Sequence, residues 1–279
     1  MMIKELCDLI ELQEVIKERV LVFSEEFDFS AVEKILEDFR DYKKIKSARL
    51  ELQSILGEDE DRIKILTCML KASANLYDVY KAKGIRDEVY VETMKCYTRF
   101  ISETYRMTGR YYFDRQWWTA RQAGGHLYRI GELEYELKLL DDKQVIDIHI
   151  PSDADFSPES VDESLEMAEE FLRVYYPETS GCDFTCDSWL LSRQLEGMLK
   201  EESNIRSFAK RFEILGEGEP DTEFIEWIFN TKTDDYEMLP ENTSLQRAMK
   251  KFILSGGTCS HERRQSEWNS LEKPERAAF

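Results

Sequence analysis

The stretch that decides the fold is Leu127–Leu140, LYRIGELEYELKLL, followed closely by VIDIHI at Val145–Ile150. In the first segment leucine and tyrosine alternate with glutamate, and in the second isoleucine alternates with aspartate and histidine. Alternation with a period of two is typical of half-buried strands. The polar stretch Asp141–Lys143 between the segments is suited to a turn. Together these features predict an antiparallel hairpin.

A helix start follows the hairpin. Pro151 cannot donate a backbone hydrogen bond to a sheet, so we expect it to end the second strand. Ser157 suits the N-cap and Pro158 the first position of a helix that reaches Tyr176, before Pro177. The unpaired N–H groups at a helix start can bind a phosphate, although most strand–loop–helix turns bind nothing. The sequence alone leaves both interpretations of this loop open.

Composition limits the classes of protein that fit. The chain has 279 residues, of which 42% are hydrophobic and 12% aromatic, enough for the core of one large domain or two ordinary ones. The net charge of −19 disfavours binding to nucleic acid or to an anionic membrane. We find no apolar run long enough to cross a bilayer and no export signal, and the six cysteines are scattered. We therefore expect a cytoplasmic protein with free thiols.

The remaining patterns predict an α+β protein. Residues 1–123 carry apolar side chains at helical spacing almost throughout, which predicts an N-terminal helical bundle. Residues 124–257 mix the two periods and predict a mixed α/β domain, and residues 258–279 read as a polar, mobile tail. Beyond the hairpin and its helix, the predicted elements are strands at 182–191, 212–215 and 224–229 and helices at 192–203 and 245–254.

Several short motifs occur in a characteristic order along almost the whole chain. They are Phe113-Asp114-Arg115 with Trp117-Trp118, IGELEYE at 130–136, HIPSDAD at 149–155, SWLL at 188–191, SNI at 203–205 and TSLQ at 243–246. With these motifs the chain resembles a bacterial acyltransferase-domain family that has a helical N-terminal domain and a GNAT-like C-terminal domain. The family belongs to the GNAT superfamily of N-acyltransferases.

The resemblance implies acetyl-CoA or another acyl-CoA as co-substrate. In such folds the strand before the long helix splays from the strand after it, and acyl-CoA lies between them. The cofactor-binding residues would be Ser152, Ala154, Phe156, Ser157, Glu159 and Ser160. The chain departs from the family in two ways: this loop has two aspartates and no glycine, and the helix expected at 192–203 has no tyrosine to act as a general acid.

His149 is the candidate catalytic residue, together with Glu134. A histidine–glutamate pair beside the splayed strands could deprotonate an amine, since histidine titrates near neutral pH. The alternative is a hydrogen-bonded structural histidine. Glu132, Glu134 and Glu136 would be either an acidic wall for a cationic amine or a solvated sheet face. No residues are assigned to a metal.

Two functions remain open from the sequence. One is an acyl-CoA-dependent N-acyltransferase that acts on an unidentified small-molecule amine. The other is a non-catalytic GNAT-like module that binds a small molecule or a protein. In either case the helical domain could contact a protein partner or a second copy of the chain.

Overall fold

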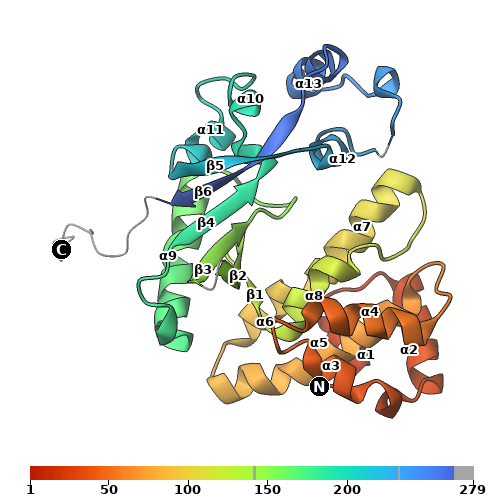
Figure 1. The fold of residues 1–279 in the computed structure, drawn as a ribbon. Helices are drawn as coiled ribbons and strands as arrows, with labels where there is room; N and C mark the ends of the chain where they lie inside the picture. Colours follow the sequence, from red (N-terminus) through yellow and green to blue (C-terminus); the bar gives the residue numbers. More distant parts are fainter. Residues whose placement is uncertain (141–142, 232, 267–279) are drawn as a thin grey trace. The chain divides into compact units, whose positions relative to one another are not determined.

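The protein is α+β, as predicted, and its chain divides into two compact units, Met1–Ile130 and Gly131–Phe279 (Figure 1). The computed structural model describes residues 1–140, 143–231 and 233–266. Part of the predicted hairpin turn, Asp141 and Asp142, lies outside the described residues. No helix among the described residues is both long and apolar enough to cross a membrane.

The first unit is helical except for its last strand, which confirms the predicted bundle. The central helix is α5 (Ile63–Lys83), in which 12 of 21 residues are buried and which packs against α1, α2 and α8. Gly84 ends α5 in the left-handed conformation that glycine adopts most easily. The other elements of this unit are α1 (Ile3–Leu9), α2 (Glu14–Glu26), α3 (Glu33–Asp38), α4 (Ile45–Leu56), α6 (Asp87–Met94), α7 (Cys96–Thr108), α8 (Gln116–Gly124) and β1 (Leu127–Ile130).

The hairpin forms as predicted, from β2 (Leu133–Leu140) and β3 (Lys143–His149), which pair antiparallel. The predicted first strand is, however, divided. Gly131 has φ +61° between β1 and β2, and a Cβ at this position would lie about 3.0 Å from Ser164. A left-handed backbone and close contact with a helix both require glycine here, so the strand breaks.

The apolar face of the hairpin packs on α9 (Pro158–Tyr175), whose N-cap is Ser157 as predicted. Leu133 donates its backbone N–H to the buried Ser164 Oγ at 3.2 Å, and the Tyr135 hydroxyl lies 3.0 Å from the same oxygen. Burial of Tyr135 raises the pKa of its hydroxyl. These contacts fix the helix against one face of the sheet and leave the other face for different side chains.

The two strands that flank α9 are parallel neighbours that part, as predicted. β4 (Phe184–Ser188) pairs with β3 through Ile146↔Phe184 and Asp147↔Thr185, and no further register pair of these strands follows. β4 is shorter than predicted because residues 189–191 turn into a 3₁₀ helix. The last register pair is Asp147 with Thr185, and the predicted site residue His149 follows Asp147 by two residues on β3.

Two predictions for the segment after β4 are wrong. The predicted strand at residues 224–229 is a helix, α12 (Glu223–Phe229), and the predicted helix at 192–203 is reduced to α10 (Arg193–Glu196). Short apolar runs such as FIEWIF fit either period, and here tertiary packing decides. Phe224, Ile225 and Phe229 share a buried cluster with residues of α10 and α13.

The rest of this segment is closer to expectation. α11 (Asn204–Ala209) and β5 (Phe212–Asp221) follow α10, and α13 (Ser244–Leu254) has Thr243 as its N-cap. The Thr243 hydroxyl accepts the backbone N–H of Gln246, whose side chain accepts the N–H of Thr243 in return, a capping box.

The expected polar tail contains a strand, which corrects that prediction. β6 (Cys259–Ser266) pairs antiparallel with both β4 and β5, so the order within the second unit is β2-β3-β4-β6-β5. In Figure 1 its blue arrow lies between them. A polar sequence without alternation gave no strand signal, yet two neighbouring strands supply its backbone partners. Residues 267–279 of the expected tail lie outside the described residues.

Candidate functional site

The face of the hairpin away from α9 carries charged side chains, and they are buried. Glu134, Glu136 and Asp147 are 2%, 0% and 2% exposed. Register pairs place them on the same face as His149, because Glu134 lies opposite His149 and Glu136 opposite Asp147. For Glu134 and Glu136, the interpretation as a solvated sheet face is therefore wrong. Charges withdrawn from water must be paired with one another.

His149 is paired with a glutamate, Glu136. The His149 Nε2 atom lies 2.8 Å from Glu136 Oε2, across the diagonal of the hairpin. Diagonal neighbours on a sheet are within reach of long side chains. Glu134 is the direct register partner of His149, and its catalytic role stays a prediction. The His149 side chain is 13% exposed, which leaves the ring within reach of a ligand.

Asp147 links this pair to two further side chains. Lys138 Nζ lies 2.6 Å from Asp147 Oδ2, and Thr185 donates its hydroxyl to Asp147 Oδ1 at 2.7 Å. The same Oδ2 atom is 3.9 Å from His149 Nε2. Thr185 stands at the last register pair before β3 and β4 part. The hydroxyl thus ties the carboxylate to the point where the strands separate.

We call Glu136, Lys138, Asp147, His149 and Thr185 the strand cluster. Sequence reasoning missed three of its members: Lys138, Asp147 and Thr185. The alternation of β2 and β3 already placed Lys138 and Asp147 on the polar face, so these two could have been found. Thr185 could not, because it comes from a strand about 40 residues away whose register only the fold reveals.

The strand cluster suits proton transfer. A neutral imidazole that donates its Nε2 proton to Glu136 carries its lone pair on Nδ1, and Glu136 would stabilise the ring once Nδ1 is protonated. One donor atom each from Glu136, Asp147 and His149 lies within 4.8 Å of the others, a grouping that in other proteins can hold a metal ion. Here the Lys138 ammonium already binds Asp147 as the cation. We therefore interpret the cluster as a proton-handling group.

The loop before α9, Ser152–Ser157, is arranged around its own anion. Asp155 Oδ1 accepts the backbone N–H of Ser157 at 2.9 Å, and Asp155 Oδ2 accepts the hydroxyls of Ser157 and Ser160, each at 2.9 Å. The Ser157 amide and, after it, the Ser160 and Ser157 hydroxyls lower the pKa of the exposed Asp155 carboxyl. Glu132 Oε2 in turn accepts the backbone N–H of Asp155 at 2.8 Å.

The other residues predicted to bind a cofactor are not gathered there. Phe156 packs edge-on against Phe208, with ring centroids 5.1 Å apart. The Ala154 N–H donates to Pro151 O at 3.1 Å within a turn, and Ser152 and Glu159 are exposed. The structure therefore brings together Ser157 and Ser160, whose hydroxyls both donate to Asp155.

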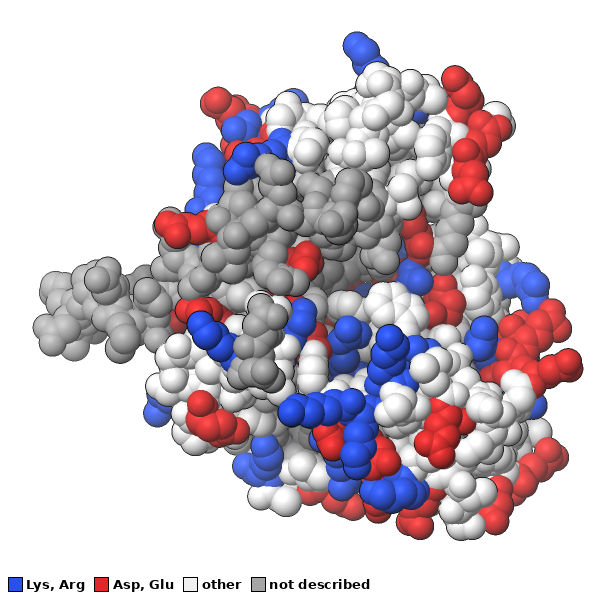
Figure 2. Space-filling view, viewed as in Figure 1, with Lys and Arg blue, Asp and Glu red and all other residues white. Residues whose placement is uncertain are grey.

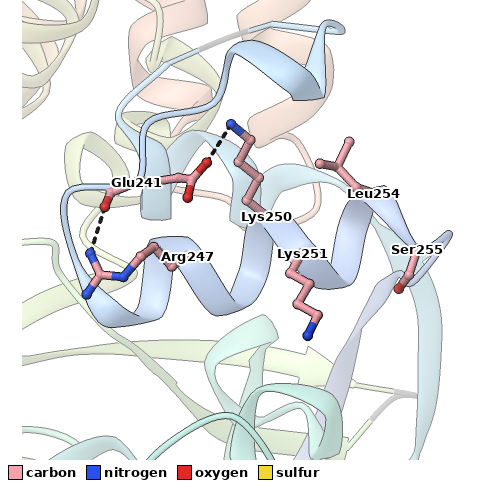
Figure 3. Close-up of a pocket in the computed structure, with 6 residues that line it drawn as sticks. All are labelled: Glu241, Arg247, Lys250, Lys251, Leu254 and Ser255. Carbon is pink, nitrogen blue, oxygen red and sulfur yellow. Dashed lines mark hydrogen bonds and ion pairs between the residues drawn. The ribbon is translucent and has the colours of Figure 1, made fainter.

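A pocket of about 370 Å³ lies on α13, apart from these residues. Figure 3 shows its lining, which includes three cations. Arg247 donates to Glu241 O at 2.8 Å, and Lys250 donates to Leu239 O at 2.9 Å and pairs with Glu241 Oε1 at 3.0 Å. Two of the three cations therefore fasten the segment before α13 to the helix.

Some charges on the surface are also paired. In Figure 2, Lys and Arg gather in the lower part of the visible face with Asp and Glu among them, and further Asp and Glu lie along the right-hand edge. In α3, for example, Asp38 Oδ1 lies 2.8 Å from Lys34 Nζ and 3.2 Å from Lys44 Nζ. Such exposed pairs contribute little to stability and do not mark a site. The strand cluster differs from them in being buried.

The fold can now be compared with known proteins. Residues 1–125 match the N-acyltransferase N-terminal domain, and residues 127–263 match the GNAT-like C-terminal domain. The solved structure of an acyltransferase in complex with decanoyl-CoA and teicoplanin is 23% identical, with a TM-score of 0.76 over 94% of this chain and 85% of that one. An acyltransferase in complex with decanoyl-CoA is 20% identical, with a TM-score of 0.76 over 94% of this chain and 86% of that one.

The comparison with curated proteins gave no match. The solved structures are too distant in sequence to show more than a shared fold, but the two domain matches adjoin one another and follow the order of the two units. The chain belongs to the family of acyltransferase-domain proteins in which an N-acyltransferase N-terminal domain precedes a GNAT-like C-terminal domain.

Proposed function

We propose that this protein is an acyl-CoA-dependent N-acyltransferase that transfers an acyl group to an amine of a small molecule. The observation that carries the proposal is the pair formed by the partly exposed His149 and the buried Glu136, close to the point where β3 and β4 part. A base oriented by a carboxylate and held on rigid strands is suited to remove a proton from an attacking nucleophile.

The parting of the strands supports the binding of an extended ligand. β3 and β4 share no register pair after Asp147 and Thr185, so beyond that point the backbone of each strand is not paired with the other. The pantetheine arm of CoA carries two amides and can bond to strand backbone as an added chain does. A thioester bound in this way would lie next to His149, which is the last residue of β3.

The chain's own groups would then carry the proton. As the amine nitrogen attacks the thioester carbon, a C–N bond forms, and His149 Nδ1 accepts a proton from the nitrogen. Glu136 holds the ring in place through Nε2 and stabilises the positive charge that the ring gains. The C–S bond then breaks, and the proton passes from the imidazolium to the departing thiolate, which gives an amide and free CoA.

The comparisons add chemical context to the proposal. The related structures are acyltransferases crystallised with decanoyl-CoA, with octanoyl-CoA, and with CoA and 10C-teicoplanin. We therefore expect acetyl-CoA or a longer acyl-CoA as donor, and a small-molecule amine as acceptor. A protein partner or a second copy bound through the helical domain stays a prediction.

One observation favours the second function, a non-catalytic binding protein. Asp155 uses the Ser157 amide and the hydroxyls of Ser157 and Ser160, which a CoA pyrophosphate would otherwise receive. A protein that had lost the cofactor would tolerate such a closed loop. Under this alternative the full chain would bind an acceptor-like molecule and release no thiol from any acyl-CoA.

The test is a transfer assay with the full chain. Acetyl-, octanoyl- and decanoyl-CoA are each incubated with a panel of amines, thiol release is followed by colour, and acylated products are identified by mass. His149→Gln and Glu136→Gln should lower the rate about 100-fold or more, the usual contribution of a general base. His126→Ala is the matched control, because His126 contacts Phe39 O in the first unit at 3.0 Å and has no part in the cluster.

Absence of transfer by the wild type with every donor and amine would refute the enzyme. A rate within threefold of wild type for His149→Gln would refute the assigned base. Thermal melts of each variant separate loss of chemistry from loss of fold.

A further inference from the structure

The strand cluster holds more charge than a base and its partner need. Besides His149 and Glu136 it contains Asp147 and Lys138, joined by an ion pair of 2.6 Å. The Asp147 carboxylate is 3% exposed and Lys138 is 26% exposed, so water screens this pair only partly. A buried ion pair often stabilises a protein no more than well-packed apolar residues of similar volume would. The Asp147–Lys138 pair therefore calls for an explanation other than stability.

The position of the pair relative to His149 suggests that reason. Asp147 Oδ2 is 3.9 Å from His149 Nε2 and is the same atom that binds Lys138 Nζ. At this distance a unit charge changes the free energy of a protonated imidazole measurably, even at a dielectric constant close to that of water. Lys138 partly cancels the field of Asp147 at the ring, and Thr185 fixes the carboxylate by its hydrogen bond to Oδ1.

We infer that Asp147 and Lys138 are positioning residues which together set how strongly His149 holds its proton. The inference rests on the proposed function, since a general base works best when it is half protonated near the working pH. By Coulomb's law the negative charge of Asp147 favours the protonated ring, and the positive charge of Lys138 opposes it.

Other charged residues lie on the same face of the sheet as His149, and they are the same in every variant. Among the described residues of the second unit, β2 contributes Glu134 and Glu136 to this face, and β4 places Asp187 on it two residues beyond Thr185. α9 packs on the opposite face of the sheet. The test therefore has to compare variants that change one charge at a time.

Two substitutions break the same ion pair from opposite ends. Asp147→Asn removes the negative charge beside the ring, and Lys138→Met removes the positive charge while keeping an apolar stem of similar length. A purely structural role predicts the same effect for both, since both lose the bond between Asp147 and Lys138. The inference predicts opposite effects on the protonation of His149.

The full chain has three histidines, so their ring protons can be followed individually by NMR across a pH titration, and His149→Gln identifies the signal. Asp147→Asn should lower the titration midpoint of His149 by about 0.5–1.5 pH units, and Lys138→Met should raise it by a smaller amount. Thr185→Val keeps both charges and should move the midpoint less than either charge variant does. The pH–rate profile of acyl transfer should move in parallel.

Midpoints that move in the same direction in the two single variants, or in neither, would overturn the inference. If Asp147→Asn does not fold, Lys138→Met is compared with the double variant Asp147→Asn/Lys138→Met. The His149 midpoint should then be lower in the double variant than in Lys138→Met. If the midpoints of the two variants shift in opposite directions but the wild type transfers no acyl group, only the proposed function is refuted. If the wild type transfers an acyl group but the two midpoints shift in the same direction, only this inference is refuted.

Discussion

In the second unit, two aspartates each accept a hydrogen bond from a hydroxyl side chain, one in the buried sheet and one in an exposed loop. In the strand cluster, Thr185 donates its hydroxyl to Asp147 at 2.7 Å, and in the α9 loop Ser160 donates its hydroxyl to Asp155 at 2.9 Å. Asp147 is buried, whereas Asp155 is exposed. The chemical bond is the same, but only the first is withdrawn from water.

That difference determines what each group can do. In the exposed loop, water can replace any bond that is lost, so Asp155 holds the turn before α9 without carrying a coupled charge. In the strand cluster each charge depends on its neighbours, so a change at one side chain alters the others. Coupling of this kind is what proton transfer requires. The same residue types therefore hold a loop turn in one place and form a candidate active site in the other.

The largest effect should come from comparing the two hydroxyls directly. Thr185→Val removes a donor to a buried carboxylate and should lower the free energy of unfolding by about 1–3 kcal/mol. Ser160→Ala removes the equivalent donor in the loop and should change it by less than about 0.5 kcal/mol. Denaturant unfolding of both variants measures the difference. Equal losses would show that the contrast in burial has no energetic meaning.

A smaller effect should appear in the binding of CoA to the loop. Asp155→Asn removes the internal anion from the start of α9, so the affinity for CoA should rise about fivefold at low salt, as expected for one charge about 4 Å away in water. Asp153→Asn removes an exposed charge from the same loop and is the matched control. Calorimetric titration of both variants gives the dissociation constants.

The loop would lose its assignment under either of two results. If Asp155→Asn binds CoA no better than wild type, the internal anion does not compete with the pyrophosphate. If Asp153→Asn gains as much affinity, the gain reflects net charge, and it should then disappear as salt is added.

The smallest effect should be a dependence of stability on acid. The pKa of Asp155 is lowered in the folded protein, chiefly by the Ser157 amide. The stability that this carboxylate contributes is therefore complete above the unfolded value of about 3.9 and is lost as the pH falls through the lower folded value. The melting temperature of wild type should exceed that of Asp155→Asn slightly at pH 6, and the gap should close towards pH 2. A gap that stays constant in acid would contradict the stabilising role of the Asp155 carboxylate in the loop.

Sequence reasoning succeeded where a local pattern determines the structure. The alternation of residues 133–140 fixed the hairpin and its apolar face, and Ser157 with Pro158 fixed the start of α9. It failed where partners distant in sequence decide. Residues 224–229 form a helix because of the cluster they share with α10 and α13, and residues 259–266 form a strand because β4 and β5 lie on either side.

The candidate site was predicted in the same uneven way. Alternation showed which side chains share the polar face, so His149 and a glutamate partner could be expected. It could not show that this face is buried, which is the property that turns a row of carboxylates into a coupled group. Nor could it show that Asp155 would fill the start of α9, since that depends on the turn of the loop.

The position of β6 has a consequence for how the protein is made. A ribosome releases the chain from its N-terminus, so β4 and β5 emerge well before residues 259–266, which must be inserted between them. Until then each of the two strands exposes a backbone edge that can pair with another chain. The second unit therefore completes its sheet only after β6 has emerged, and chaperones that shield strand edges would protect it until then.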